Sequence, residues 1–155
     1  MVWLVLAPAA SAQDDVRLTR DAPFARGADG KVLGTLRTGA EVTAGPTRGG
    51  WIQVTLEGWI ISGSVGRDVR DGFELGVSAD RGENIRAEPN GRIVARLRYG
   101  ALLERVGARG GWVKVRRTGW LSRRAVDRVV ETAQAPRGGP DPARPLPVAP
   151  GRARP

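Results

Sequence analysis

The stretch RGGWIQVTLEGWI, residues 48–60, returns in the second half of the chain as RGGWVKVRRTGWL, residues 109–121. In both stretches two tryptophans lie eight residues apart, and each tryptophan follows a glycine. The match extends outward without a gap, so that residues 22–65 align with residues 83–126 at a constant offset of 61. Shared composition does not give a match of this length, and the chain therefore contains two copies of one structural unit.

Each copy reads as a series of short strands separated by turns. An Asp-Gly pair at residues 29–30 and an Asn-Gly pair at residues 90–91 are strong hairpin signals, and strand-like segments, KVLGTL and RIVARL, follow them. Gly58 and Gly119 are expected to separate the tryptophan strand from one last short strand. No segment keeps an apolar period of 3.6 residues, so the pattern favours about five strands per copy, folded as a small barrel.

The tryptophan strand alternates between apolar and polar side chains. In WIQVTLEG and WVKVRRTG, which begin at Trp51 and Trp112, the apolar positions share one face, which we expect to be core. Trp51 and Trp112 then share the other face with polar residues, where either packing or ligand binding would explain them. Trp59 and Trp120 each precede an apolar residue, and we expect them to cover the core.

The composition restricts the chemistry that the chain can perform. It has no Cys and no His, which excludes disulfides, Cys/His zinc sites and nucleophiles activated by His. We therefore expect no catalytic residue, no metal site and no cofactor, and we expect the protein not to be an enzyme. The net charge is +9, and residues 71–131, with 13 basic and 8 acidic groups, carry most of it. Such a surface attracts polyanions, although charge alone does not select one.

The two ends of the chain differ in composition from the copies. Residues 1–12 combine a short apolar run with an Ala-Ser-Ala sequence, which is typical of a secretory signal peptide cut after Ala12. No Lys or Arg precedes the run, so the basic start of the signal is expected to be clipped. Residues 132–155 are rich in Pro, Arg, Gly and Ala and predict a disordered tail. These features indicate a periplasmic or secreted protein without a transmembrane span.

The second copy resembles bacterial SH3-like (SH3b) domains. The resemblance rests on an N-[IV]-R-x-x-P opening at residues 84–89, the hairpin GRIVARLRYG, the strand GGWVKV and the closing GWL. The first copy is similar, although residues 23–26, PFAR, replace the N-I-R of the opening. The resemblance implies an all-β fold.

From the repeat and the resemblance together we expect two tandem small SH3-like barrels. The first would span residues 14–66 and the second residues 75–129, with a linker at residues 66–74. The disordered tail rich in Pro and Arg would follow from residue 132.

The resemblance also implies a function, because many such domains target peptidoglycan or its stem peptides. A scaffold for another envelope protein and polyanion binding through the basic second copy are the alternatives, without specific nucleic-acid recognition. The candidate ligand-binding residues are Trp51 and Trp112 for stacking, Arg86, Lys114 and Arg116 for pairing with carboxylates, and Tyr99, which lies among the arginines of the second copy.

Overall fold

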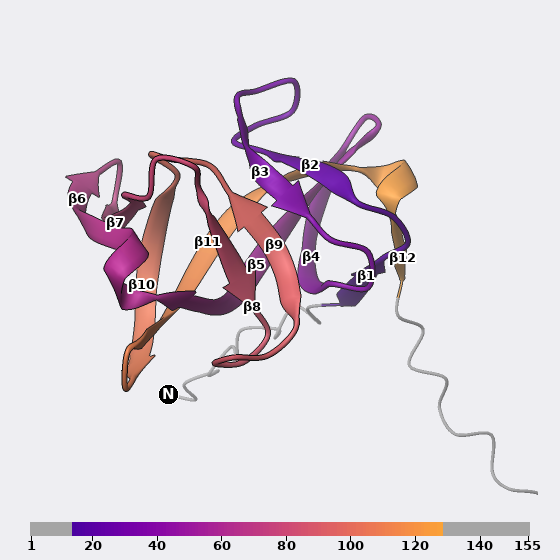
Figure 1. Cartoon of the computed structure of the whole chain (residues 1–155). Helices are drawn as coiled ribbons and strands as arrows, with labels where there is room; N and C mark the ends of the chain where they lie inside the picture. Colours follow the sequence, from indigo (N-terminus) through magenta and orange to yellow (C-terminus); the bar gives the residue numbers. More distant parts are fainter. Residues whose placement is uncertain (1–13, 129–155) are drawn as a thin grey trace, which may run out of the picture.

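The structure, a computed structural model, describes residues 14–128 and contains only strands and two short 3-10 turns there (Figure 1). The expected signal peptide and tail lie outside the described residues. The elements are β1 (Asp15–Leu18), β2 (Ala22–Ala25), β3 (Val32–Leu36), β4 (Glu41–Arg48), β5 (Trp51–Ile61), η1 (Ser62–Ser64), β6 (Val65–Arg70), β7 (Phe73–Val77), β8 (Glu83–Arg86), β9 (Ile93–Leu97), β10 (Leu102–Arg109), β11 (Trp112–Ser122), η2 (Arg123–Ala125) and β12 (Val126–Arg128).

Six of the strands close a barrel. They run in the order β5-β8-β9-β3-β2-β11, and β11 pairs again with β5. The sheet also continues from the first half of β5, on the edge that β8 uses further along, through β4, β1 and β12. In the same way it continues from the first half of β11 through β10, β7 and β6. Figure 1 shows these two extensions on opposite sides of the barrel, with β6 and β7 at one side and β1 and β12 at the other. The all-β prediction is therefore confirmed.

The two copies interlock in place of forming the two tandem barrels that we expected. Strand β2 of the first copy pairs with β11 of the second, and β8 of the second pairs with β5 of the first. The two tryptophan strands also pair along their whole length, from Trp51 opposite Ser122 to Ile61 opposite Trp112. A unit of about 50 residues has a small core, and sharing one barrel gives both copies a larger one.

The segment expected to link two domains is itself a hairpin. Residues 66–74 fall in β6, in the turn at Asp71 and Gly72, which both have positive φ, and in the start of β7. In the other half of the molecule the equivalent pair is β12 with β1, where Arg128 lies opposite Val16. The two ends of the described chain therefore lie side by side.

The interlocked copies are related by a local twofold axis. Equivalent residues differ by 61, and the central pair of the β5–β11 ladder joins Leu56 to Arg117, its own counterpart. The axis passes through this pair. One apolar core spans both copies, and Phe24, Leu36 and Ile85 are fully buried in it.

The expectation that glycine ends the tryptophan strand is wrong. Strand β5 runs through Gly58, and β11 runs through Gly119. A Cβ at Gly58 would lie 2.4 Å from Cγ2 of Ile85, and one at Gly119 would lie 2.5 Å from Cε2 of Phe24. Glycine is required because β8 and β2 cross closely over these strands. In contrast, the two predicted hairpin turns are confirmed, at residues 26–31 and 87–92.

Candidate binding surface

All four repeat tryptophans lie on one outer face of the β5–β11 ladder. Each is half-buried, and each alternates along its strand with a buried residue. This confirms the predicted face of Trp51 and Trp112. The expectation that Trp59 and Trp120 cover the core is wrong, because both share that outer face. The strands continue through the glycines, and the alternation continues with them.

The tryptophans gather as two clusters, one near each end of the ladder. Trp51 lies opposite Ser122 and Trp120 lies opposite Gln53, so the two indoles are diagonal neighbours. Trp59 and Trp112 are related in the same way at the other end. We call these the Trp51/Trp120 cluster and the Trp59/Trp112 cluster. Each contains one tryptophan from each copy, so neither cluster exists in a single copy.

An arginine accompanies each cluster. Arg48 lies opposite Trp51 in the β4–β5 hairpin, and Arg109 lies opposite Trp112 in the β10–β11 hairpin. The guanidinium carbon of Arg109 is 5.4 Å from the centre of the Trp59 ring, within the range of a cation–π contact. Eight residues of strand separate the clusters, which is at most about 26 Å at 3.3 Å per residue.

The candidate residues Lys114, opposite Trp59, and Arg116, opposite Glu57, belong to an ion-pair network. Nη2 of Arg116 lies 2.6 Å from Glu57 Oε1, and Nη1 lies 3.7 Å from Glu104. The hydrogen bond to Glu57 raises the pKa of Arg116. Nζ of Lys114 lies 3.6 Å from the other oxygen of Glu57. The charges of both cations are therefore partly neutralised. Lys114 has the longer contact with Glu57, so its charge is the more available to a ligand.

Arg86 lies beside the Trp59/Trp112 cluster. It is opposite Trp59 in the β5–β8 pairing, so the three strands β8, β5 and β11 place Arg86, Trp59 and Lys114 in one row. Nη1 of Arg86 donates a hydrogen bond to the carbonyl oxygen of Gly91 at 2.8 Å, which holds the β8–β9 turn. The structure thus brings Trp59, Trp112, Arg86 and Lys114 together.

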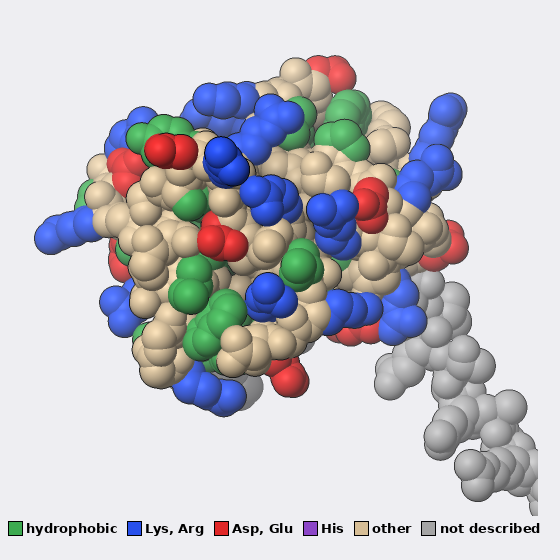
Figure 2. Space-filling model, viewed as in Figure 1, with side chains coloured by type: hydrophobic (Ala, Val, Ile, Leu, Met, Phe, Trp, Pro, Cys, Tyr) green, Lys and Arg blue, Asp and Glu red, His purple; other side chains and the backbone are tan. Residues whose placement is uncertain are grey.

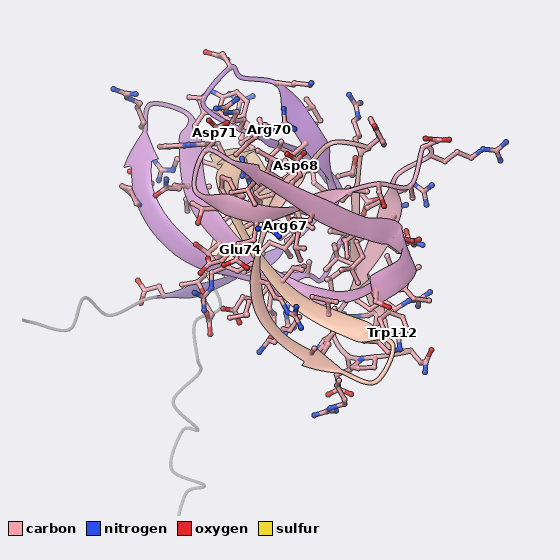
Figure 3. The ribbon with its side chains drawn as sticks, turned by 90° about the vertical axis from the view of Figure 1, so that its left-hand side faces the viewer. Arg67, Asp68, Arg70, Asp71, Glu74 and Trp112 are labelled. Carbon is pink, nitrogen blue, oxygen red and sulfur yellow. The ribbon has the colours of Figure 1, made fainter. Side chains whose placement is uncertain are left out.

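Tyr99, the remaining candidate, lies elsewhere. It is 64% exposed in the turn between β9 and β10, on the wall of a basic pocket that also includes Arg98 and Arg117. In Figure 3, Arg70 and Asp71 of this pocket lie at the opposite end of the molecule from Trp112. Stacking on Tyr99 therefore cannot take part in the same contact as stacking on Trp112.

Arg117 is the residue that the sequence interpretation missed. Its side chain is only 5% exposed, and its Nε and Nη1 are buried without a hydrogen-bond partner in the described part of the chain. Burial lowers the pKa of Arg117, and the charge of Arg26 lowers it further. The signal was present in the sequence, because Arg117 continues the apolar face of β11 and aligns with Leu56 of the first copy. Charged residues are rarely buried, so a charge at a core position is informative.

Residues 14–128 contain no group of three or more acidic, His or Cys side chains placed to hold a metal ion. The same residues include no helix of the length and apolarity that a bilayer crossing needs. Comparisons of the chain with protein-family models, with curated proteins and with solved structures give no match. The interpretation of the site therefore depends on its own chemistry.

Proposed function

We propose that this protein is an exported, non-enzymatic binding protein, built from two bacterial SH3-like copies, that binds peptidoglycan or its stem peptides. The observation that supports this proposal is the pair of equivalent tryptophan clusters on one outer face. Half-buried indoles offer a rigid flat surface with one polar N–H, which suits stacking against sugar rings and peptide groups. The interlocked fold supports the proposal because it builds each cluster from both copies.

The Trp59/Trp112 cluster carries the polar groups that fit a stem peptide. Lys114 and Arg86 flank Trp59 in one row, and Arg109 lies over its ring. These cations would pair with peptide carboxylates while the indoles contact the apolar parts. In the Trp51/Trp120 cluster the twofold-related places hold Gln53 in place of Lys114 and Ala25 in place of Arg86. This cluster therefore lacks those two cations, and its neutral Gln53 and Ser122 suit hydrogen bonding to sugar hydroxyls.

Two equivalent clusters favour a repetitive polymer over a single small ligand. Each cluster alone is shallow and would bind weakly. A polymer that reaches both clusters binds the second one at a high effective concentration, so its avidity exceeds the affinity of either cluster. The separation of at most about 26 Å sets the length of polymer that is needed.

The proposal is tested by tryptophan fluorescence with soluble peptidoglycan fragments of increasing length. We expect longer fragments to bind more tightly to the wild type, with saturable changes in emission. The variants Trp51→Ala with Trp120→Ala and Trp59→Ala with Trp112→Ala should each lose this length dependence, since one cluster remains. Each double variant is the control for the other, because the twofold axis makes them similar in their effect on the fold. Binding that is unchanged in both would contradict the proposal.

One observation favours a protein partner as the second candidate. Ile61, opposite Trp112, is 44% exposed, and it extends the Trp59/Trp112 cluster with an apolar side chain. A protein surface would bury both, with Trp112 as an interface anchor. Crosslinking in cells would then trap one discrete partner, while peptidoglycan fragments would leave the fluorescence unchanged.

A further inference from the structure

The basic pocket at Arg117 is formed by segments of both copies. It has a volume of about 190 Å³ and lies where the β2–β3, β6–β7 and β9–β10 turns meet β11. A cavity of this size has room for several waters or for a small organic acid. Figure 2 shows Lys and Arg side chains over the whole visible face, including its upper part, where these turns lie in Figure 1.

The pocket is strongly positive. Among residues 14–128, Asp71 is the only acidic side chain that lines it, against the basic side chains of Arg26, Lys31, Arg70, Arg98 and Arg117.

Only some of these charges are neutralised. Arg70 forms two hydrogen bonds with Asp68, at 2.7 and 2.8 Å, and Arg26 lies 3.4 Å from Asp71. Within residues 14–128, no ion pair involves Lys31, Arg98 or Arg117. Three cations therefore meet at one small cavity without a carboxylate of their own.

The floor of the pocket is held in place. The guanidinium carbon of Arg117 lies 4.1 Å from the centre of the Phe73 ring, so the planar group stacks on β7. Nε and Nη1 of Arg117 are buried, and they donate no hydrogen bond to any group of residues 14–128. A fixed, desolvated guanidinium recognises an oxyanion more strongly than a solvated one, because a charged hydrogen bond is stronger in a medium of low dielectric.

The twofold-related half of the molecule serves as an internal comparison. There the counterpart of Arg117 is the apolar Leu56, and the counterpart of Arg98 is Arg37, whose Nη1 lies 2.8 Å from Asp21. The counterpart of Asp21 in the second copy is Gly82, which has no carboxylate. The unpaired positive charge is thus a property of this pocket and is not required by the fold.

We propose that this pocket binds the oxyanion of a small ligand, a carboxylate or a phosphate, against Arg117 and Arg98. Phe73 and Tyr99, with the apolar wall of β3 and β10, would hold a short apolar or aromatic part of the same ligand. The site is separate from the tryptophan clusters, so this proposal goes beyond the proposed function and does not depend on it.

The test is a titration of the full chain, followed by the NMR signals of arginine Nε–H groups and of the backbone of Phe73 and Tyr99. Sodium phosphate and sodium propionate are the two probes, and sodium chloride at equal ionic strength is the control. We expect saturable shifts with at least one probe and none with chloride. Tighter binding of phosphate would indicate a phosphate ester as the ligand, and tighter binding of propionate would indicate a carboxylic acid.

Variants separate this site from general attraction to a basic surface. Arg117→Met should weaken binding by about ten-fold or more, which is the loss of one charge-assisted contact. Arg98→Met, at the rim, should weaken it less. Arg124→Met, which removes an exposed arginine outside the pocket, should leave it unchanged. Shifts that chloride reproduces, or equal affinity in wild type and Arg117→Met, would overturn the proposal.

Discussion

Replacing Arg117 by methionine should stabilise the protein while it removes anion binding. Methionine is unbranched and similar in length to the arginine stem, so it fills the same space without a charge. The first copy already carries an apolar residue, Leu56, at the equivalent position of the ladder, which shows that the fold accepts one there.

The expected change in the free energy of unfolding follows from the contacts of Arg117. The variant removes a buried guanidinium with two unpaired nitrogens, and an unsatisfied buried group costs about 1–3 kcal/mol, or more when charged. It also loses the desolvated contact with Phe73, which is worth about 2 kcal/mol. Apolar replacements of buried ion pairs are neutral or stabilise by about 1–4 kcal/mol. Arg117 has no ion-pair partner within residues 14–128 that the replacement would leave unpaired, so we expect a net gain of about 1–3 kcal/mol. At about 4 °C per kcal/mol for a domain of this size, Tm should rise by about 4–12 °C.

Urea unfolding measures this gain best, because guanidinium chloride is a salt and would screen the charges around Arg117. The midpoint should rise with an unchanged slope. Arg124→Met is the matched control, and since its side chain is exposed it should change stability by less than about 0.5 kcal/mol. Added phosphate should stabilise the wild type more than Arg117→Met, because only the wild type binds it in the pocket. If Arg117→Met is less stable than the wild type, the burial of this unpaired charge does not destabilise the protein and the reasoning is refuted.

Three further predictions concern the fold. Gly58→Ala should destabilise the protein by about 1–3 kcal/mol or more in urea unfolding, since the new Cβ would overlap β8. Gly63→Ala is the control, because a Cβ there has open space and should leave the stability nearly unchanged. Equal effects of the two substitutions would contradict the close passage of β8 over β5. Hydrogen bonds from Thr38 and Arg37 lower the pKa of Asp21 from 3.8 to about 2, so its stabilising contribution is present above pH 3.8 and is lost as the pH falls toward 2. In Asp21→Asn, unfolding curves should therefore vary less with pH in that window, and an unchanged pH dependence would refute the assignment. A fragment of residues 14–66 should be unfolded or dimeric by light scattering, because β5 lacks β11 and β8; a stable monomer would show that one copy closes its own barrel.

The sequence predicted the local structure better than it predicted how the copies pair. The repeat, the hairpin turns and the outward face of Trp51 and Trp112 depend on neighbouring residues, and all of them are confirmed. The exchange of β2 and β8 between copies was missed for a physical reason. A strand of one copy presents the same residues and the same hydrogen-bonding edge to either tryptophan strand, so local pattern does not distinguish the two partners.

Two residues of the tryptophan strands, Gly58 and Arg117, were not interpreted correctly from the sequence. Gly58 looks like a strand end in sequence, whereas it marks the close passage of another strand, and glycine serves both purposes. Arg117 was visible as a charge on a core face, opposite Leu56 in the alignment of the copies. What the sequence could not give is the basic pocket, because its walls come from turns that are far apart along the chain.

The central claim, that two tryptophan clusters bind cell-wall polymer, is tested most directly by sedimentation of the full chain with purified sacculi. We expect the wild type to sediment with sacculi at moderate salt, since stacking resists screening better than attraction between exposed charges. Retention should fall in either double tryptophan variant and be abolished in the fourfold variant, while Arg117→Met should be retained like the wild type. Failure of the wild type to sediment, or retention of the folded fourfold variant, would contradict the account.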